Sequence, residues 1–221
     1  MDKIVLLVFI VIILSIYFYT SRIFKKYQKI DIRSLMSGFE VARNLIDSYG
    51  FNDVYITENR SLLYSKYDSN RKVIRLSDDI FNSTSVTSCA LSAREAVSCI
   101  LDKKNDKYFK LIDKLSPLFN ILIYIGYLVI GIGTLFGHMK TMWIGIYLEM
   151  IVFFFYVLTF KYENRLCSFA ISILKSNKII TKKENDMIKT VLNASRYINF
   201  ANIISPIILL VIMIVNFGKS K

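Results

Sequence analysis

Four long apolar runs constrain this chain more than any other feature of its sequence. They cover residues 4–20, 118–136, 142–160 and 198–217. Each is close to the roughly 20 residues that a helix needs to cross the hydrocarbon core of a bilayer. Backbone N–H and C=O groups cannot stay unpaired in lipid, so each run is expected to be helical. The sequence therefore predicts a membrane protein, mainly α, with about four transmembrane helices.

The first run is expected to be a permanent anchor rather than a cleaved signal peptide. The residues before it are only weakly positive, and no small-x-small cleavage pattern follows it. Basic residues follow instead, as is typical where a membrane helix ends: Arg22, Lys25, Lys26 and Lys29.

The placement of positive charge predicts the topology. The chain has a formal net charge of +12 and 29 Lys and Arg residues; 17 of these lie between residues 21 and 117, and eight between 161 and 197. Four crossings put both basic segments on one side, and the positive-inside tendency makes that side the cytoplasm. Both termini are then outside. The bilayer, with its anionic lipids, explains the charge, so no nucleic acid partner is expected.

These observations divide the chain into five parts. We expect an N-terminal transmembrane anchor at 1–20, a cytoplasmic α+β part at 21–117, a transmembrane helical hairpin at 118–160, a basic cytoplasmic helical segment at 161–197 and a C-terminal transmembrane helix at 198–221. The protein is thus expected to be a multi-pass protein of the cell membrane.

Local signals outline the cytoplasmic segments. Ser37 and Glu40 have the spacing of a capping box, which predicts a helix that starts there and closes at Gly50. Thr181 and Glu184 form a second pair of this kind, before a helix over 182–194. Further expected elements are strands at 53–57, 62–67 and 72–76, the last two as a hairpin, and a second helix at about 84–104.

Two stretches of the cytoplasmic part carry a family resemblance. Residues 37–43 read SGFEVAR and residues 67–77 read YDSNRKVIRLS. Together with the order of elements, they resemble the bacterial membrane-bound "putative neutral zinc metallopeptidase" family over nearly the whole chain. The resemblance implies that the α+β part is zincin-like. It also implies a second helix with the pattern H-E-x-G-H, in which two histidines bind zinc and the glutamate acts on the metal-bound water.

This chain departs from that pattern at the metal ligands. The matching stretch is Arg94-Glu95-Ala96-Val97-Ser98, so the glutamate is kept and both histidines are absent. The resemblance implies that Arg94, Ser98 and Glu163 occupy former metal-ligand positions, with Glu163 matching the third, carboxylate ligand. Glu95 would be a vestigial general base. The expected protein is a degenerate, HExxH-lacking member of the family.

The histidine count also argues against zinc hydrolysis. The chain has one histidine, His138, in the outer link between two crossings, so one chain cannot supply two zinc-binding histidines. Arg94 adds a fixed positive charge, because arginine keeps its proton at any working pH. No zinc or other cofactor is therefore expected. Arg94 is expected either to replace the ion and pair with Glu163 and Glu95, or to point into solvent.

The functional prediction is a pseudopeptidase that binds a peptide, a membrane protein or an active relative without cutting it. Two alternatives remain open. One is an active metallopeptidase with unusual ligands, drawn from Glu95, Glu163, Cys99 and Cys167. The other is a membrane scaffold or transport accessory whose function does not use the old site.

A last feature is Glu149, which lies inside the third apolar run. A charge near the centre of a bilayer costs roughly 2.5–3.5 kcal/mol on insertion scales. Glu149 is therefore expected to be buried in the helix bundle, protonated or near the outer end. A proton or ion path and a satisfied packing contact, for instance with Asn199 or Asn202, are both compatible with this position.

Overall fold

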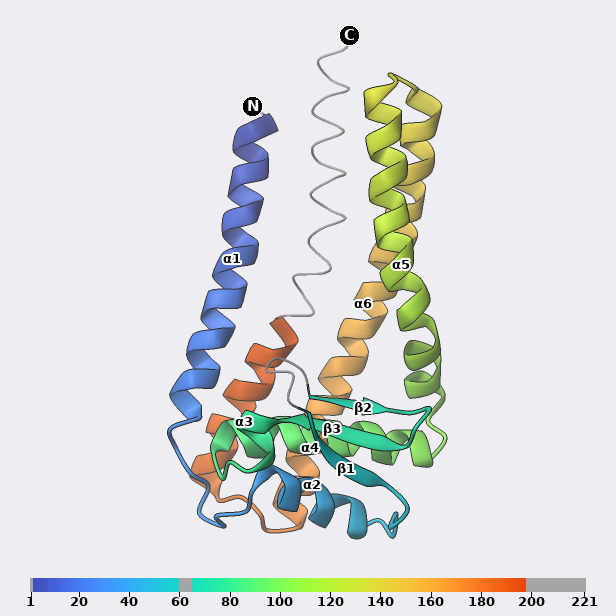
Figure 1. Cartoon of the computed structure of the whole chain (residues 1–221). Coiled ribbons are helices and arrows are strands. Elements are labelled where there is room, and N and C mark those ends of the chain that lie inside the picture. The colour runs from blue at the N-terminus through green and yellow to red at the C-terminus, as the bar shows by residue number, and fades with distance from the viewer. Residues whose placement is uncertain (1, 60–64, 198–221) are drawn as a thin grey trace. The chain divides into compact units, whose positions relative to one another are not determined.

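The computed structural model describes residues 2–59 and 65–197, with side chains from residue 11 onward. The elements are α1 (Asp2–Tyr27), α2 (Gly38–Asp47), β1 (Tyr55–Asn59), β2 (Lys66–Asp68), β3 (Val73–Ser77), α3 (Asp78–Phe81), α4 (Val86–Lys103), α5 (Lys107–Leu135) and α6 (Met139–Ser176) (Figure 1). Residues 182–197 are also helical. The expected mainly helical chain with a small sheet is confirmed.

The chain forms two compact units. Of the described residues, the helical unit contains 2–18, 111–161 and 197, and the α+β unit contains 19–59, 65–110 and 162–196. Most of the two basic segments therefore belongs to one compact unit, although more than 50 residues of the helical unit separate them in sequence.

The sheet of the α+β unit has three strands in the order β1-β3-β2. β2 and β3 pair antiparallel, which confirms the expected hairpin, whereas β1 pairs with β3 in parallel. β1 begins at Tyr55 rather than at Asp53, because Asp53 lies in a turn and bonds Lys103 at the end of α4. Part of the strand expected at 62–67 lies outside the described residues.

Helices α2 and α4 form the core of this unit. The predicted capping box is present: the Ser37 hydroxyl accepts from the Glu40 amide, and the Glu40 carboxylate accepts from the Ser37 amide. The apolar stripe of α2 is buried against α4 and the sheet, and α4 itself is buried on almost all sides. Each fully buried aliphatic side chain contributes about 1.5–3 kcal/mol, so α4 is a rigid element from which to present a site.

Helix α6 is longer than the sequence predicted. We expected a boundary near residue 161, but α6 continues without a break to Ser176. The residues change from apolar to charged near residue 161. The helix continues because many charged residues are also good helix formers. The second predicted cap is present beyond α6, since the Thr181 amide donates to Glu184 Oε2 at 2.6 Å.

In the helical unit, α5 and α6 form an antiparallel hairpin (Figure 1). Gly137, with a φ of 66°, ends the first helix in a conformation that only glycine adopts without strain. Both helices are long and apolar enough to cross a membrane. They contain the run expected at 142–160 and, except for its last residue, the run expected at 118–136. The run at 4–20 is part of α1, whose first side chains are not described, and the run at 198–217 lies outside the described residues.

Candidate functional site

Helix α4 presents three of the four predicted site residues. Arg94 and Ser98 are one helical turn apart, and Glu95 follows Arg94. Since α4 lies at the centre of the α+β unit, Glu95 is only 4% exposed and Ser98 only 8%. The Ser98 hydroxyl donates to the Arg94 carbonyl oxygen at 3.2 Å, within its own helix.

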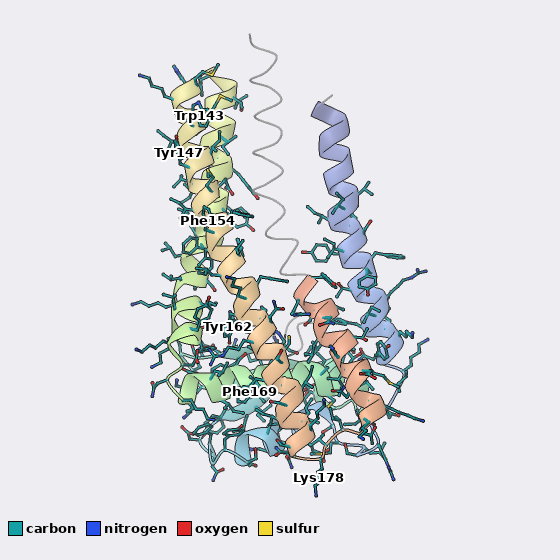
Figure 2. All side chains as sticks on the ribbon, turned by 180° about the vertical axis from the view of Figure 1, so that it is seen from behind. Trp143, Tyr147, Phe154, Tyr162, Phe169 and Lys178 are labelled. Atoms are coloured by element: carbon teal, nitrogen blue, oxygen red, sulfur yellow. The ribbon has the colours of Figure 1, made fainter. Side chains whose placement is uncertain are left out.

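Glu163 on α6 faces Arg94. The Arg94 Nη2 lies 2.7 Å from Glu163 Oε1, and Nε lies 3.2 Å from Oε2. This two-point geometry is the strong form of an arginine–carboxylate pair. Glu163 is 6% exposed, and its neighbour Tyr162 marks the same stretch of α6 in Figure 2.

Glu95 is held from two sides. Its Oε1 accepts a hydrogen bond from Arg94 Nη1, and its Oε2 accepts one from the backbone amide of Tyr67 at 2.9 Å. Tyr67 lies in β2, one of the two edge strands of the sheet. The four carboxylate oxygens of Glu95 and Glu163 therefore each accept a hydrogen bond from the protein, and a single guanidinium supplies three of these bonds.

The charges of this cluster are strongly coupled. Burial alone would lower the pKa of Arg94, but the negative charges of Glu163 and Glu95 raise it well above its usual value. Burial raises the pKa of Glu95 by more than Arg94 and the Tyr67 amide lower it. Arg94 is thus a permanent cation, and burial opposes the negative charge of Glu95.

Tyr67 also fixes β2 to the far end of α4. Its hydroxyl donates to Asp102 Oδ2 at 2.8 Å, and Lys72 Nζ lies 2.7 Å from the same oxygen. Glu95 and Asp102 are seven residues, or two turns, apart on α4. One tyrosine therefore aligns the edge strand along the helix that carries the site.

Aromatic rings flank the cluster. The ring of Tyr162 lies 6.4 Å from that of Tyr108 and 6.3 Å from that of Phe109, which in turn lies 6.3 Å from Tyr67. Burial raises the pKa of the Tyr162 hydroxyl. This hydroxyl has no hydrogen-bond partner within the part of the chain that the structure describes. Sequence reasoning missed both Tyr67 and Tyr162.

The structure brings together Arg94, Glu95 and Glu163 as one interpretation of the sequence predicted, and it rejects the interpretation in which Arg94 points away into solvent. Zinc binds thiolate, imidazole and carboxylate groups, and of these three side chains only Glu95 and Glu163 offer such a donor. A guanidinium has no lone pair to donate and repels a cation. The residues present thus do not fit the ion that the resemblance implies.

The alternative ligand set is not assembled either. Among residues 2–59 and 65–197, no group of three or more His, Cys, Asp and Glu side chains is arranged to hold a metal ion. Cys99 and Cys167 are buried free thiols, and burial raises the pKa of each to about 11. Such thiols act as small apolar side chains at neutral pH.

Comparisons with known proteins agree with the resemblance seen in the sequence. The family model described as "Putative neutral zinc metallopeptidase" matches residues 3–218. The chain is also similar to the "Putative membrane protease YugP" of Bacillus subtilis (strain 168), with 28% identity over 172 residues, which cover 78% of this chain and 76% of that protein. No solved structure matches the chain.

Proposed function

We propose that this chain, which belongs to the neutral zinc metallopeptidase family, is a non-catalytic member that binds a peptide or a membrane protein without cleaving it. The observation that carries this proposal is the Arg94 guanidinium, which bonds both Glu163 and Glu95. In this proposal Arg94 takes the place of the ion, and Ser98 and Glu163 are former ligand positions.

The absence of hydrolysis follows from what the residues can do. Metal-dependent hydrolysis needs a Lewis acid that lowers the pKa of a bound water. A guanidinium cannot coordinate water, so it does not supply that effect. A general base must also be within reach of the proton that it removes. Both oxygens of Glu95 already accept hydrogen bonds, so Glu95 serves here to join Arg94 to Tyr67.

A binding function is supported by the part of the scaffold that is kept. β2 is an edge strand, and its residue Tyr67 contacts Glu95 directly. Extended peptides commonly bind by adding a strand to the edge of a sheet. Because the Tyr67 amide already donates to Glu95, a peptide added at β2 would bond only to the edge groups that remain. A segment bound there would lie beside the Arg94 cluster without meeting a metal-activated water.

We further propose that both basic segments lie on the cytoplasmic side and both termini outside. This is supported by the contacts within the α+β unit: Arg94 of the first segment bonds Glu163 of the second, and the Arg33 amide donates to Glu184. Segments that pack together must lie on one side of the membrane. The hairpin of α5 and α6 then crosses and returns between them.

Cysteine labelling tests this topology, since the native cysteines Cys89, Cys99 and Cys167 are all buried. A membrane-impermeant maleimide should label His138→Cys in intact cells, and Asn70→Cys only after permeabilisation. Labelling of Asn70→Cys in intact cells would overturn the topology.

Zinc content and proteolysis test the loss of catalysis. The full-length protein, purified in detergent, should contain far less than one zinc per chain and should not cleave casein. A known zinc protease in the same detergent is the positive control. About one zinc per chain together with chelator-sensitive cleavage would overturn the proposal.

Photocrosslinking separates a binding role at the site from a scaffold role elsewhere. A photoreactive amino acid at Lys66, which is exposed on β2, should give adducts with a membrane protein or peptide. The same adducts should be lost when Arg94→Met, Glu95→Gln and Glu163→Gln are combined in a chain that still folds. If the adducts persist unchanged, the scaffold role is favoured instead.

A further inference from the structure

Glu149 is the only Asp, Glu, Lys, Arg or His residue in the four apolar runs of the chain. It lies in α6, within the helical unit, whereas the Arg94 cluster belongs to the α+β unit. A charged side chain in such a run needs a partner of opposite charge or a proton. None of the apolar runs, including the one outside the described residues, contains a cation that could pair with it.

The structure places Glu149 inside the hairpin rather than at its surface. Its side chain faces Gly126 of α5, and the residue is only 1% exposed. A Cβ atom on Gly126 would lie 2.2 Å from Glu149 Oε1. The glycine thus provides the space that the carboxyl group occupies, so the two positions fit each other.

Neither carboxyl oxygen of Glu149 has a hydrogen-bond partner within the part of the chain that the structure describes. Elsewhere in the hairpin, the Tyr156 hydroxyl donates to Asn120 Oδ1 at 2.9 Å, so this hydroxyl hydrogen is already used. Among the described residues, the titratable groups that act electrostatically on Tyr156 are Glu149 and two tyrosines, Tyr124 and Tyr127. Tyrosines are uncharged at neutral pH, so they do not neutralise a carboxylate.

We propose that the Glu149 carboxyl carries a bound proton, so that Glu149 and Gly126 form a proton-binding site inside the α5–α6 hairpin. A proton needs one oxygen, which the site offers. A hard metal cation needs six or more oxygen ligands, whereas Glu149 supplies at most two. The proton removes the charge that the apolar surroundings oppose, and the carboxylic acid becomes a potential donor within the hairpin.

Infrared spectroscopy of the full-length protein tests this assignment. At neutral pH, the difference spectrum between wild type and Glu149→Gln should contain the C=O stretch of one protonated carboxylic acid. In D₂O this band should move to lower frequency, because the proton exchanges. Glu163→Gln is the matched control and should leave the band in place. A wild-type spectrum in which Glu149 contributes only carboxylate bands would overturn the proposal.

A chemical probe gives a second readout that does not need a folded Glu149 variant. A hydrophobic carbodiimide reacts with a protonated carboxyl by addition, and the acyl group then moves from oxygen to nitrogen to give an N-acylurea with no leaving group. In wild-type protein, mass spectrometry should place the main adduct on Glu149. A water-soluble carbodiimide should label exposed carboxyls such as Asp186 instead. Absence of the Glu149 adduct, with its peptide observed unmodified, would contradict the proposal.

Discussion

Arg94 of α4 and Glu163 of α6, 69 positions apart in sequence, form a two-point ion pair with nitrogen–oxygen distances of 2.7 and 3.2 Å. The same guanidinium also donates a hydrogen bond to Glu95. A bound ion can join ligands from separate elements of a fold. Here the Arg94 side chain joins Glu95 of α4 to Glu163 of α6. The Arg94 guanidinium therefore compensates the charge of two buried acidic residues of the α+β unit.

Removing the guanidinium should destabilise the fold. Arg94→Met leaves two buried carboxylates without their cation, and losing one partner of a buried pair costs roughly 3–5 kcal/mol. We expect about 3 kcal/mol, at the low end, because the Arg94 side chain is 21% exposed. Thermal or denaturant unfolding in detergent, followed by circular dichroism, measures the loss.

Arg165→Met is the matched control for that variant. Arg165 lies on the same helix as Glu163 and pairs with Asp106 at 2.7 Å, but its side chain is 55% exposed. Exposed pairs contribute about 1 kcal/mol or less. Adding Glu95→Gln and Glu163→Gln to Arg94→Met should recover much of the lost stability, since no buried charge then remains. Equal losses for Arg94→Met and Arg165→Met would contradict the importance of the buried cluster.

Restoring imidazoles should create a metal site. Arg94→His with Ser98→His places two histidines one turn apart on α4, at the position where Arg94 now contacts Glu163. With Glu163 this makes the His₂Glu set of catalytic zinc sites. Elemental analysis should find about one zinc per chain in the double variant and much less in wild type.

The matched controls for the zinc gain change one ligand at a time. Arg94→His with Ser98→Ala should bind zinc at least tenfold more weakly than the double histidine variant, and so should the double variant with Glu163→Gln added. If the double variant gains no zinc affinity although it folds, then Glu163 does not lie at the third ligand position.

Local sequence signals predicted the helices well and the sheet only in part. The Ser37–Glu40 and Thr181–Glu184 caps depend on residues three apart, so a sequence carries them directly. The parallel pairing of β1 with β3 has no such local signature. The length of α6 was also missed, because the change in hydropathy near residue 161 marks a change of surroundings rather than the end of a helix.

The candidate site was predictable where side-chain identity carries the chemistry. The Arg94–Glu163 pair was one of two interpretations, since this chain has an arginine where the family pattern has a histidine, and the structure selects it. The contribution of Tyr67 was not predictable, because a backbone amide is the same at every residue and only the register of β2 brings this one to Glu95. Tyr162 was not predictable for a similar reason, because its burial depends on which face of α6 packs inward.

Acidification should weaken the α+β unit through Glu184. Burial acts to raise the pKa of Glu184, but hydrogen bonds from Thr181 and from the Arg33 amide outweigh it, so that the pKa is lowered. A lowered pKa in the folded state gives stability that is present above the unfolded value of about 4.3 and is lost as the pH falls through the folded value. Glu184→Gln should therefore cost about 1–2 kcal/mol at pH 7 and less at pH 3.

The nearby exposed residue Asp186 provides the control for this pH effect. Asp186→Asn should change the free energy of unfolding by no more than about 0.5 kcal/mol at either pH. Denaturant unfolding at pH 7 and pH 3 gives the comparison. If Glu184→Gln lost more stability at pH 3 than at pH 7, the predicted direction of the pH dependence would be wrong.

Two glycines of α5 should respond differently to alanine. A Cβ on Gly133 would lie 2.6 Å from Met142 Cγ and 2.8 Å from the Met142 backbone nitrogen, whereas a Cβ on Gly131 would meet nothing within 4 Å. Gly133→Ala should therefore cost about 1–3 kcal/mol through overpacking. Gly131→Ala should be neutral or gain up to about 1 kcal/mol from helix propensity. Adding Met142→Ala should recover only part of the stability that Gly133→Ala loses, because the backbone nitrogen of residue 142 cannot move away as a side chain can.

Thermal unfolding of the three variants gives the comparison. Equal unfolding midpoints for Gly131→Ala and Gly133→Ala would show that the helices do not approach closely at Gly133.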